Sequence, residues 1–148
     1  MQNPKNKKAS GEIWRTALNS WAIPENILSK AEESPWIHPP VLFEIPKIIE
    51  NNPSHDRARE VLVSEGSVLD VGCGGGIAAF ALVPHVNKVI GVDHQQEMLE
   101  MFSKNAERYG VSHKEVLGFW PEVSEQVPQV DVVVSHHVAY NVPNIEEF

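Results

Sequence analysis

Residues 68–77 read VLDVGCGGGI, and this stretch decides the fold class. The run up to Gly72 is apolar apart from Asp70, which is typical of a buried strand. Four glycines then fall within five positions, before an apolar segment that begins at Ile77. Glycines let a backbone approach a ligand more closely than any Cβ would allow. A tight turn alone needs only one or two of them, so this stretch predicts a ligand-binding loop at the carboxyl end of a strand.

Short apolar runs alternate with helical patterns throughout the remainder of the chain. Strands of this kind, separated by helices, are typical of crossover units in a parallel sheet. The second helical pattern stops at Gly110, a residue that commonly ends helices. We predict strands at 68–71, 88–93, 115–117 and 130–134, and helices at 77–83 and 95–109.

The residues before this region have a different character. Three of the four tryptophans and seven of the eleven prolines precede residue 54. Apolar spacing predicts a helix at 11–21, a second that starts at Pro24 and carries Ala31, and a third at about 55–64 with Ser54 as its N-cap. We therefore divide the chain into a flexible basic tail (1–10), a helical N-terminal segment (11–64) and a ligand-binding core (65–148). The N-terminal segment is expected either to form a cap or lid over the site or to cover one face of the sheet.

Composition restricts the setting and the partners of the protein. The 148 residues suffice for about one domain, and no apolar run approaches the length of a membrane span. A net charge of −8 disfavours binding to phosphate backbones, so a nucleic-acid or membrane partner is not expected. The single cysteine, Cys73, allows no internal disulfide and builds no zinc site alone, so we interpret it as a small packing residue. These features predict a cytoplasmic protein without a metal.

The glycine pattern restricts the ligand. The dinucleotide fingerprint requires glycine at its sixth position, where this sequence has Ile77, and the Gly-Lys-Ser/Thr of a phosphate loop is absent. Glycine instead occupies alternate positions, Gly72, Gly74 and Gly76, with Asp70 two residues upstream. A carboxylate at that point would repel a pyrophosphate and attract a positive charge.

A second acid, Asp93, ends the next predicted strand, 21 residues after Gly72. A carboxylate at this position of a nucleoside-binding sheet can accept hydrogen bonds from both ribose hydroxyls. An anionic site beside a ribose site fits an adenosyl ligand that carries a cationic amino-acid arm.

Residues 68–143 resemble the class I S-adenosylmethionine-dependent methyltransferases, in particular the small bacterial members. The resemblance lies in LDVGCGGG (69–76), VIGVDHQQEML (89–99) and VDVVVSHHVAYNV (130–142). It implies a Rossmann-like parallel sheet in the order 3-2-1-4, S-adenosyl-L-methionine as cofactor, and methyl transfer to a small-molecule acceptor. It also implies a cofactor site formed by Asp70, Gly72, Cys73, Gly74, Gly76, Asp93, His94, Met98, Phe119, Trp120, Ser135 and His136.

The sequence departs from the family pattern after the third strand. An acid that faces the adenine amino group is usual there, whereas this chain has Gly118-Phe119. Phe119 cannot accept that hydrogen bond, so a backbone group must replace it and Trp120 is expected to stack. Methyl transfer needs mainly alignment of the reactants, and the weak candidates for a base are His136, His137 and Tyr140.

Two other functions remain open at this point: a nicotinamide-dependent oxidoreductase on a similar sheet, and a non-catalytic protein that binds the cofactor or a partner. The family sheet has seven strands in the order 3-2-1-4-5-7-6, and about four are found here. Asn144 and Glu147 resemble the start of a further helix. The sequence therefore predicts an incomplete, inactive domain that self-associates through the edge of strand 130–134.

Overall fold

The computed structural model describes residues 4–62 and 65–148, with side chains from Ser10 onward. It separates into two compact units. The first comprises the residues up to His38 together with His137–Phe148, and the second comprises Pro39–His136. Each unit is described separately below.

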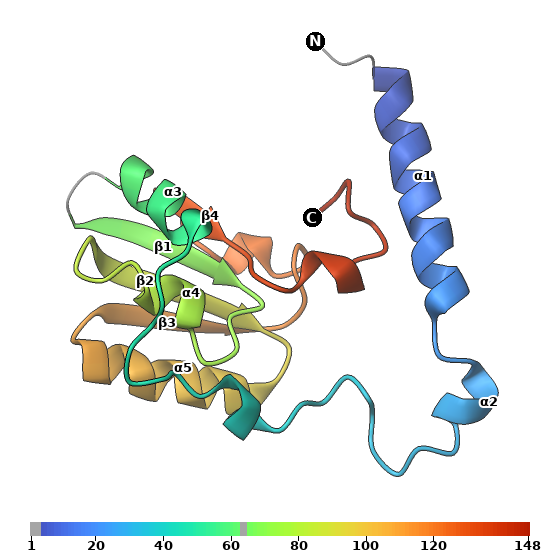
Figure 1. The fold of residues 1–148 in the computed structure, drawn as a ribbon, viewed down its shortest axis with the longest axis horizontal. Helices are drawn as coiled ribbons and strands as arrows, with labels where there is room; N and C mark the ends of the chain where they lie inside the picture. The colour runs from blue at the N-terminus through green and yellow to red at the C-terminus, as the bar shows by residue number, and fades with distance from the viewer. Residues whose placement is uncertain (1–3, 63–64) are drawn as a thin grey trace. The chain divides into compact units, whose positions relative to one another are not determined.

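The second unit is built on a four-stranded sheet, shown in Figure 1. Its strands are β1 (Gly66–Val71), β2 (Val86–Asp93), β3 (Ser112–Leu117) and β4 (Val132–Val134). All neighbours are parallel and the order is β3-β2-β1-β4, which confirms the predicted topology. The predicted strands are present, but β1, β2 and β3 begin earlier than expected and β4 begins later.

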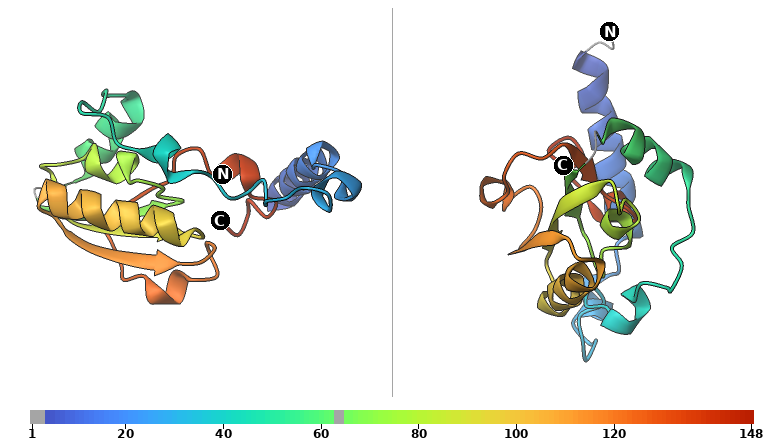
Figure 2. Two further views of the ribbon diagram at one scale, coloured as in Figure 1. Left: turned by 90° about the horizontal axis from the view of Figure 1, so that it is seen from below. Right: turned by 90° about the vertical axis from the view of Figure 1, so that its left-hand side faces the viewer.

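Three helices cover one face of this sheet: α3 (Pro53–Val61), α4 (Ile77–Phe80) and α5 (Gln96–Tyr109). Figure 2 shows them on one side, with the 3₁₀ turn η2 (Ser124–Gln126) beyond the opposite side. The core under the helices includes Val68, Leu82 and Val89 together with the Phe80–Phe102 ring pair. The burial of these side chains provides the main stabilisation of the unit.

Helix α5 follows the sequence prediction closely. It begins next to the expected Gln95 and ends at Gly110, whose φ of 68° is left-handed. Met98, Leu99, Phe102 and Ala106 are buried along one side, as their spacing predicts. Its position is important because the loop that precedes it carries His94.

The N-cap of α3 corrects the prediction. The capping residue is Asn52, not Ser54, and its Oδ1 accepts the backbone N–H of His55 at 3.0 Å. Pro53 occupies the first turn, where its fixed φ and missing N–H are tolerated. That placement moves the cap upstream of the proline. The predicted end of this helix, at residue 64, lies outside the described residues.

Helix α4 is shorter than predicted. It ends at Phe80 rather than near Val83, and the chain continues in turns up to Pro84. Pro84 has no N–H to donate to the Phe80 carbonyl, and its ring would clash with that carbonyl in a continuous helix, so the helix does not extend past Phe80. The short helix still places the Ala79 N–H beneath the end of β1, where it contacts Asp70.

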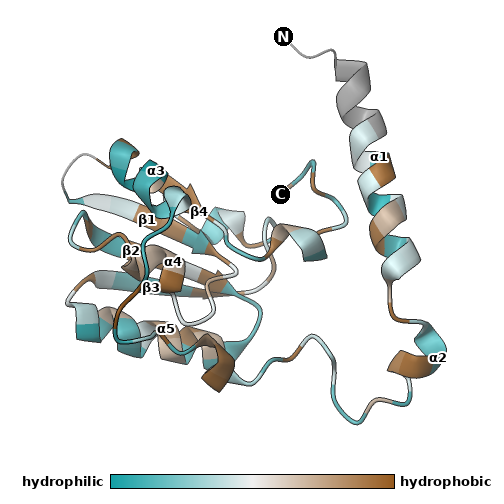
Figure 3. Ribbon diagram, in the orientation of Figure 1, coloured by the Kyte–Doolittle hydropathy of each residue, from teal (hydrophilic) through white to brown (hydrophobic). Residues whose placement is uncertain are grey.

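The first unit contains α1 (Pro4–Trp21), α2 (Glu25–Leu28) and the turn η3 (Ala139–Asn141). Helix α1 begins within the segment predicted as a tail, and α2 ends before Ala31. The Trp14 indole N–H donates to the Val142 carbonyl at 2.8 Å and ties α1 to the C-terminal segment. Figure 3 shows hydrophobic positions on both helices, and Trp21 is 82% exposed.

The expected helix start at Asn144 is a turn, in which the Glu147 N–H donates to the Asn144 carbonyl.

Within residues 4–62 and 65–148, no helix combines the length and the apolarity that crossing a membrane requires.

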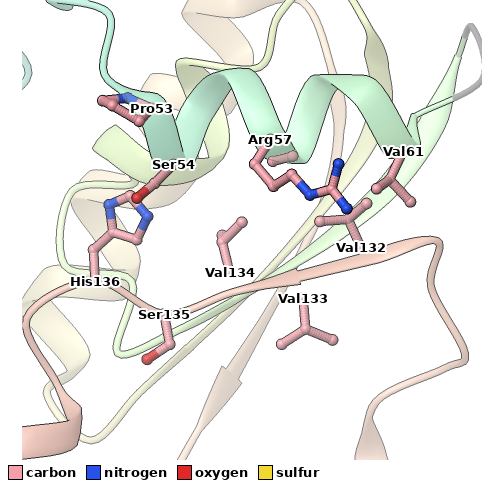
Figure 4. A pocket seen from close by; sticks show the side chains of 10 residues that line it. Pro53, Ser54, Arg57, Val61, Val132, Val133, Val134, Ser135 and His136 are labelled. Atoms are coloured by element: carbon pink, nitrogen blue, oxygen red, sulfur yellow. The ribbon is translucent and has the colours of Figure 1, made fainter.

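One edge of β4 pairs with β1, and no strand of the described chain pairs with the other edge. Val133 on this strand is 59% exposed. Figure 4 shows the groove beside it, lined by side chains of α3 and β4, among them Val61 and Arg57. An apolar edge of this kind offers unpaired backbone groups to another chain.

We therefore expect concentration-dependent self-association of this chain through β4. Replacement Val133→Lys places a charge on the edge strand and is expected to shift the protein toward monomer. Size-exclusion chromatography with light scattering measures the effect, and Ile48→Lys, at a site that is 80% exposed outside the sheet, is the control. A wild-type protein that stays monomeric at every concentration would contradict the prediction.

Candidate functional site

The glycine loop lies between β1 and α4, at the carboxyl edge of the sheet. Gly72, Gly74 and Gly76 have φ values of 70°, 50° and 90°. These left-handed conformations favour glycine strongly over residues with a side chain. The N–H groups of Gly72 and Cys73 donate to the Val92 carbonyl at 2.8 and 3.0 Å, which holds the start of the loop against the end of β2.

Asp93 ends β2 and joins the loop to the chain that precedes α5. Its Oδ2 accepts the Gly74 N–H at 3.0 Å, and its Oδ1 accepts the Gln95 N–H at 3.0 Å. The residue is 8% exposed, as an acid with two charge-assisted partners can be. Because each carboxylate oxygen has two lone pairs, both can still accept one further hydrogen bond.

Asp70 lies in β1 and is 1% exposed. Its Oδ2 accepts the Ala79 N–H at 3.2 Å. Burial raises the pKa of this carboxyl to about 8, and the nearby Asp93 carboxylate acts in the same direction, while the Ala79 N–H opposes it. Asp70 is therefore a neutral acid at pH 7, and an arriving cation would favour its ionised form.

Cys73 is the one residue of the loop with a side chain, and Met98 lies on the inner side of α5. Both are buried, and a Cβ added to Gly91 would lie 2.9 Å from the Cys73 Sγ. Burial raises the pKa of the Cys73 thiol well above its ordinary value, and Asp70 and Asp93 add to this effect. The thiol is consequently protonated and packed.

Two aromatic rings stack next to Asp93: that of His94, which follows it in the chain, and that of Phe119, in the loop after β3. The His94 and Phe119 rings have centroids 5.0 Å apart and planes 18° apart. The Gly118 N–H donates to the Asp93 carbonyl at 2.9 Å and thereby brings the loop after β3 next to the end of β2. Trp120, from which we expected stacking, is half-buried, whereas Phe119 is the ring that lies against His94.

Ser135 and His136 follow β4 at the same edge of the sheet. The Ser135 hydroxyl donates to the Val71 carbonyl at 3.1 Å, next to the start of the glycine loop. The His136 ring stacks on His55 of α3, with centroids 5.6 Å apart and planes 7° apart. The other two base candidates, His137 and Tyr140, belong to the first unit.

The hydrogen bonds of Asn52 fix the tautomer of His55. Since Asn52 Oδ1 accepts a backbone N–H, its Nδ2 faces the ring and must donate to His55 Nε2, 3.2 Å away. The proton of the neutral ring therefore lies on Nδ1, which is buried. Burial lowers the pKa of His55, and positive charge on His136 or Arg59 lowers it further.

Three contributors to this region carry no recognisable sequence signal: Phe43, His55 and Asn105. The Asn105 side chain, on α5, donates to the Gly75 carbonyl at 2.8 Å. Phe43 lies against the loop from a segment 30 residues upstream in the chain. No group of three potential metal ligands occurs within residues 4–62 and 65–148.

Residues 68–148 match a family model described as a methyltransferase domain. The chain is 40% identical over 74 residues to a ribosomal protein L11 methyltransferase from Photobacterium profundum, covering 49% of this chain and 25% of that protein. It is 37% identical over 71 residues to a probable cobalt-precorrin-6B C(15)-methyltransferase from Pyrobaculum calidifontis, covering 45% and 36% respectively.

A further relative is the uncharacterised methyltransferase YcgJ from Bacillus subtilis, 32% identical over 88 residues, covering 57% of this chain and 34% of that protein. The chain thus spans between a quarter and about a third of the length of these relatives. Among solved structures, an rRNA methylase from Streptococcus thermophilus shares the fold, with a TM-score of 0.51 at 24% identity over 63% of this chain and 58% of that one.

The pKa of Asp70 predicts a pH dependence of stability. The folded chain keeps a proton that the unfolded chain releases above about pH 4, so this residue lowers the free energy of unfolding as the pH rises from 4 to 8. Asp70→Asn retains an acceptor for the Ala79 N–H and removes the titration. We expect its stability relative to wild type to rise by about 2–5 kcal/mol between pH 4 and 8. Urea unfolding at several pH values measures this, and a constant difference would contradict it.

The lowered pKa of His55 predicts that the free energy of unfolding changes with pH in the direction opposite to that of Asp70. The unfolded chain binds a proton below about pH 6.5 that the folded chain resists, so acid reduces the free energy of unfolding through this residue. His55→Gln is expected to remove part of the loss of stability between pH 7 and 5, whereas replacement of the exposed His85 by Gln is not. Thermal unfolding across this range tests the difference between the two variants.

Proposed function

The chain belongs to the methyltransferase-domain family, and from this premise we propose that it binds S-adenosylmethionine and transfers its methyl group to an acceptor. The observation that carries the proposal is the placement of Asp70 and Asp93. Asp70 is the penultimate residue of β1 and Asp93 is the last residue of the neighbouring β2, and the loop that follows β1 contains three left-handed glycines. A nucleoside with a cationic arm fits this pair, because the cation favours the ionised form of Asp70, whereas a pyrophosphate gains no such attraction.

Asp93 is assigned to the ribose of the cofactor. Its two oxygens are oriented by the Gly74 and Gln95 N–H groups, so their remaining lone pairs have fixed directions. A pair of adjacent hydroxyls can donate one hydrogen bond to each oxygen. The same bonds hold the loop in place before the ligand arrives, which reduces the entropy lost on binding.

Asp70 is assigned to the ammonium side of the amino-acid arm. As a neutral acid it costs less to bury in the free chain than a carboxylate would. An ammonium nearby would favour the carboxylate and release its proton, so binding is coupled to pH. His94 and Phe119 are assigned to the adenine side, and the buried Met98 of α5 is assigned to the adenine or ribose side as well.

The acceptor side of the reaction is assigned to the chain that follows β4. When bound, S-adenosylmethionine supplies an electrophilic methyl group on a good leaving group, so the protein has mainly to align the acceptor. His136 lies beside the groove between α3 and β4 that Figure 4 shows. Its imidazole is the candidate to accept a proton from an oxygen or nitrogen acceptor.

We propose a small molecule as acceptor. The net charge of −8 favours a neutral or cationic substrate over a phosphate backbone. The named relatives include a methyltransferase for a ribosomal protein and one for a cobalt-precorrin, so acceptors of several classes belong in the assay.

Calorimetry with S-adenosylhomocysteine and with NAD tests the cofactor assignment. We expect heat from the first ligand and none from the second, because Ile77 occupies the position of the third glycine in the dinucleotide fingerprint. Binding of NAD without binding of the adenosyl ligand would support the oxidoreductase instead. Transfer of labelled methyl groups to a panel of small molecules, ribosomal protein and RNA then separates an enzyme from a non-catalytic binding protein.

Asp93→Ala is expected to weaken binding of S-adenosylhomocysteine by about 1–3 kcal/mol, since the ribose hydroxyls lose a charged acceptor. Asp93→Asn is expected to lie between this variant and wild type, because one oxygen acceptor remains. Glu97→Ala, a change in the first turn of α5, is the matched control. Equal affinity of Asp93→Ala and wild type, at equal folded fraction, would remove Asp93 from the site.

A further inference from the structure

We propose that Phe43 is a positioning residue for the glycine loop, and that it couples the docking of residues 39–52 to cofactor binding. These residues, called the strap below, connect the start of the second unit to α3. The inference rests on the proposed binding of S-adenosylmethionine but concerns a segment outside the motifs that indicated it.

Within the glycine loop, only Cys73 has a side chain that can hold the backbone in one conformation. Within the loop, the Gly76 N–H donates to the Cys73 carbonyl at 2.8 Å. Glycine loses more conformational entropy on ordering than any other residue, and three of these glycines adopt left-handed backbone. The loop therefore depends on contacts from outside: Asp93 at Gly74, Asn105 at Gly75, and Phe43 at both glycines.

Phe43 occupies the space into which loop side chains would project. A Cβ added to Gly74 would lie 3.0 Å from the Phe43 Cδ1, and one added to Gly75 would collide with the Phe43 carbonyl oxygen. Gly75 has no left-handed φ, unlike Gly72, Gly74 and Gly76. A Cβ on Gly75 would also lie 2.9 Å from the Met101 Sδ, at the far end of a flexible side chain. The close approach of the Phe43 backbone, rather than the backbone conformation of Gly75, is thus the main reason for a glycine there.

The strap is held on the helical face of the sheet by alternate side chains. Its 3₁₀ turn η1 (Pro40–Phe43) packs against α5, and Ile45 and Ile49 pack on the hydrophobic core. Figure 1 shows the strap passing from η1 to α3 along the face that carries α4 and α5. Leu42, by contrast, is 70% exposed. The strap is therefore attached at a few points, of which Phe43 is the one that meets the loop.

A docked strap favours the loop conformation in which the Gly74 N–H meets Asp93. A ligand that requires this conformation must in turn favour the docked strap, because coupling between two binding events is reciprocal. A Phe43 that merely filled space would contribute to global stability without affecting the loop selectively. Removal of the Phe43 ring should therefore loosen the loop selectively if the residue positions the loop, and should lower only the global stability if it fills space.

The test compares Phe43→Ala with Leu42→Ala, the exposed neighbour in the same turn. We expect Phe43→Ala to raise the Kd for S-adenosylhomocysteine about tenfold and Leu42→Ala to change it less than about twofold. Hydrogen exchange of the Gly74, Gly75 and Gly76 amides should accelerate in ligand-free Phe43→Ala, while amides of β2 and α5 keep their protection. Gly75→Ala, which meets the Phe43 carbonyl, is expected to reproduce the loss of affinity.

Phe43→Leu keeps an apolar side chain and is expected to restore part of the affinity, which provides a test if Phe43→Ala does not fold. Wild-type affinity in folded Phe43→Ala would overturn the inference. If Phe43→Ala does not fold, wild-type affinity in both Phe43→Leu and Gly75→Ala would overturn it. Faster exchange throughout the unit, with no selective effect on the loop, would overturn it as well. Failure of the wild-type chain to bind S-adenosylhomocysteine would instead overturn the proposed function on which the inference rests.

Discussion

The hydrogen bonds of Asp93 connect the parts of the site that are distant in sequence. One oxygen accepts from Gly74 in the loop after β1, and the other accepts from Gln95 before α5. The carbonyl of the same residue accepts from Gly118 after β3. Three loops at the carboxyl edge are thus anchored on one residue, and the remaining geometry of the candidate site follows from the parallel register of β1 and β2.

The two buried acids have different physical roles because their partners differ. Asp93 has two backbone N–H partners that stabilise a carboxylate, and each of its two oxygens accepts one of these hydrogen bonds. Asp70 has one N–H partner, is more deeply buried and faces the charge of Asp93, so its pKa rises to about 8. A site that keeps one anion and one neutral acid avoids the repulsion of two buried charges, and a cationic ligand can then stabilise the second anion.

Local patterns predicted the elements whose causes are local. The strand runs, the glycine loop, α5 and its end at Gly110 follow from apolar spacing and from glycine chemistry. The prediction of Ser54 as the N-cap of α3 was wrong. Asn52 and Ser54 are both good capping residues, and only the position of Pro53 in the first turn decides between them. The contacts of Phe43, His55 and Asn105 join residues far apart in the chain, so no periodicity reveals them.

The glycine run combines two different physical requirements. Gly72, Gly74 and Gly76 are needed for left-handed backbone, so a side chain there is strained in any surroundings. Gly75 is needed because another part of the chain comes close, so its requirement depends on the strap being in place. In the sequence, the glycines required by left-handed backbone and the glycine required by a close contact look the same. The distinction links the segment before α3 to the loop, and through Gly74 to Asp93, by contacts that all lie within the second unit.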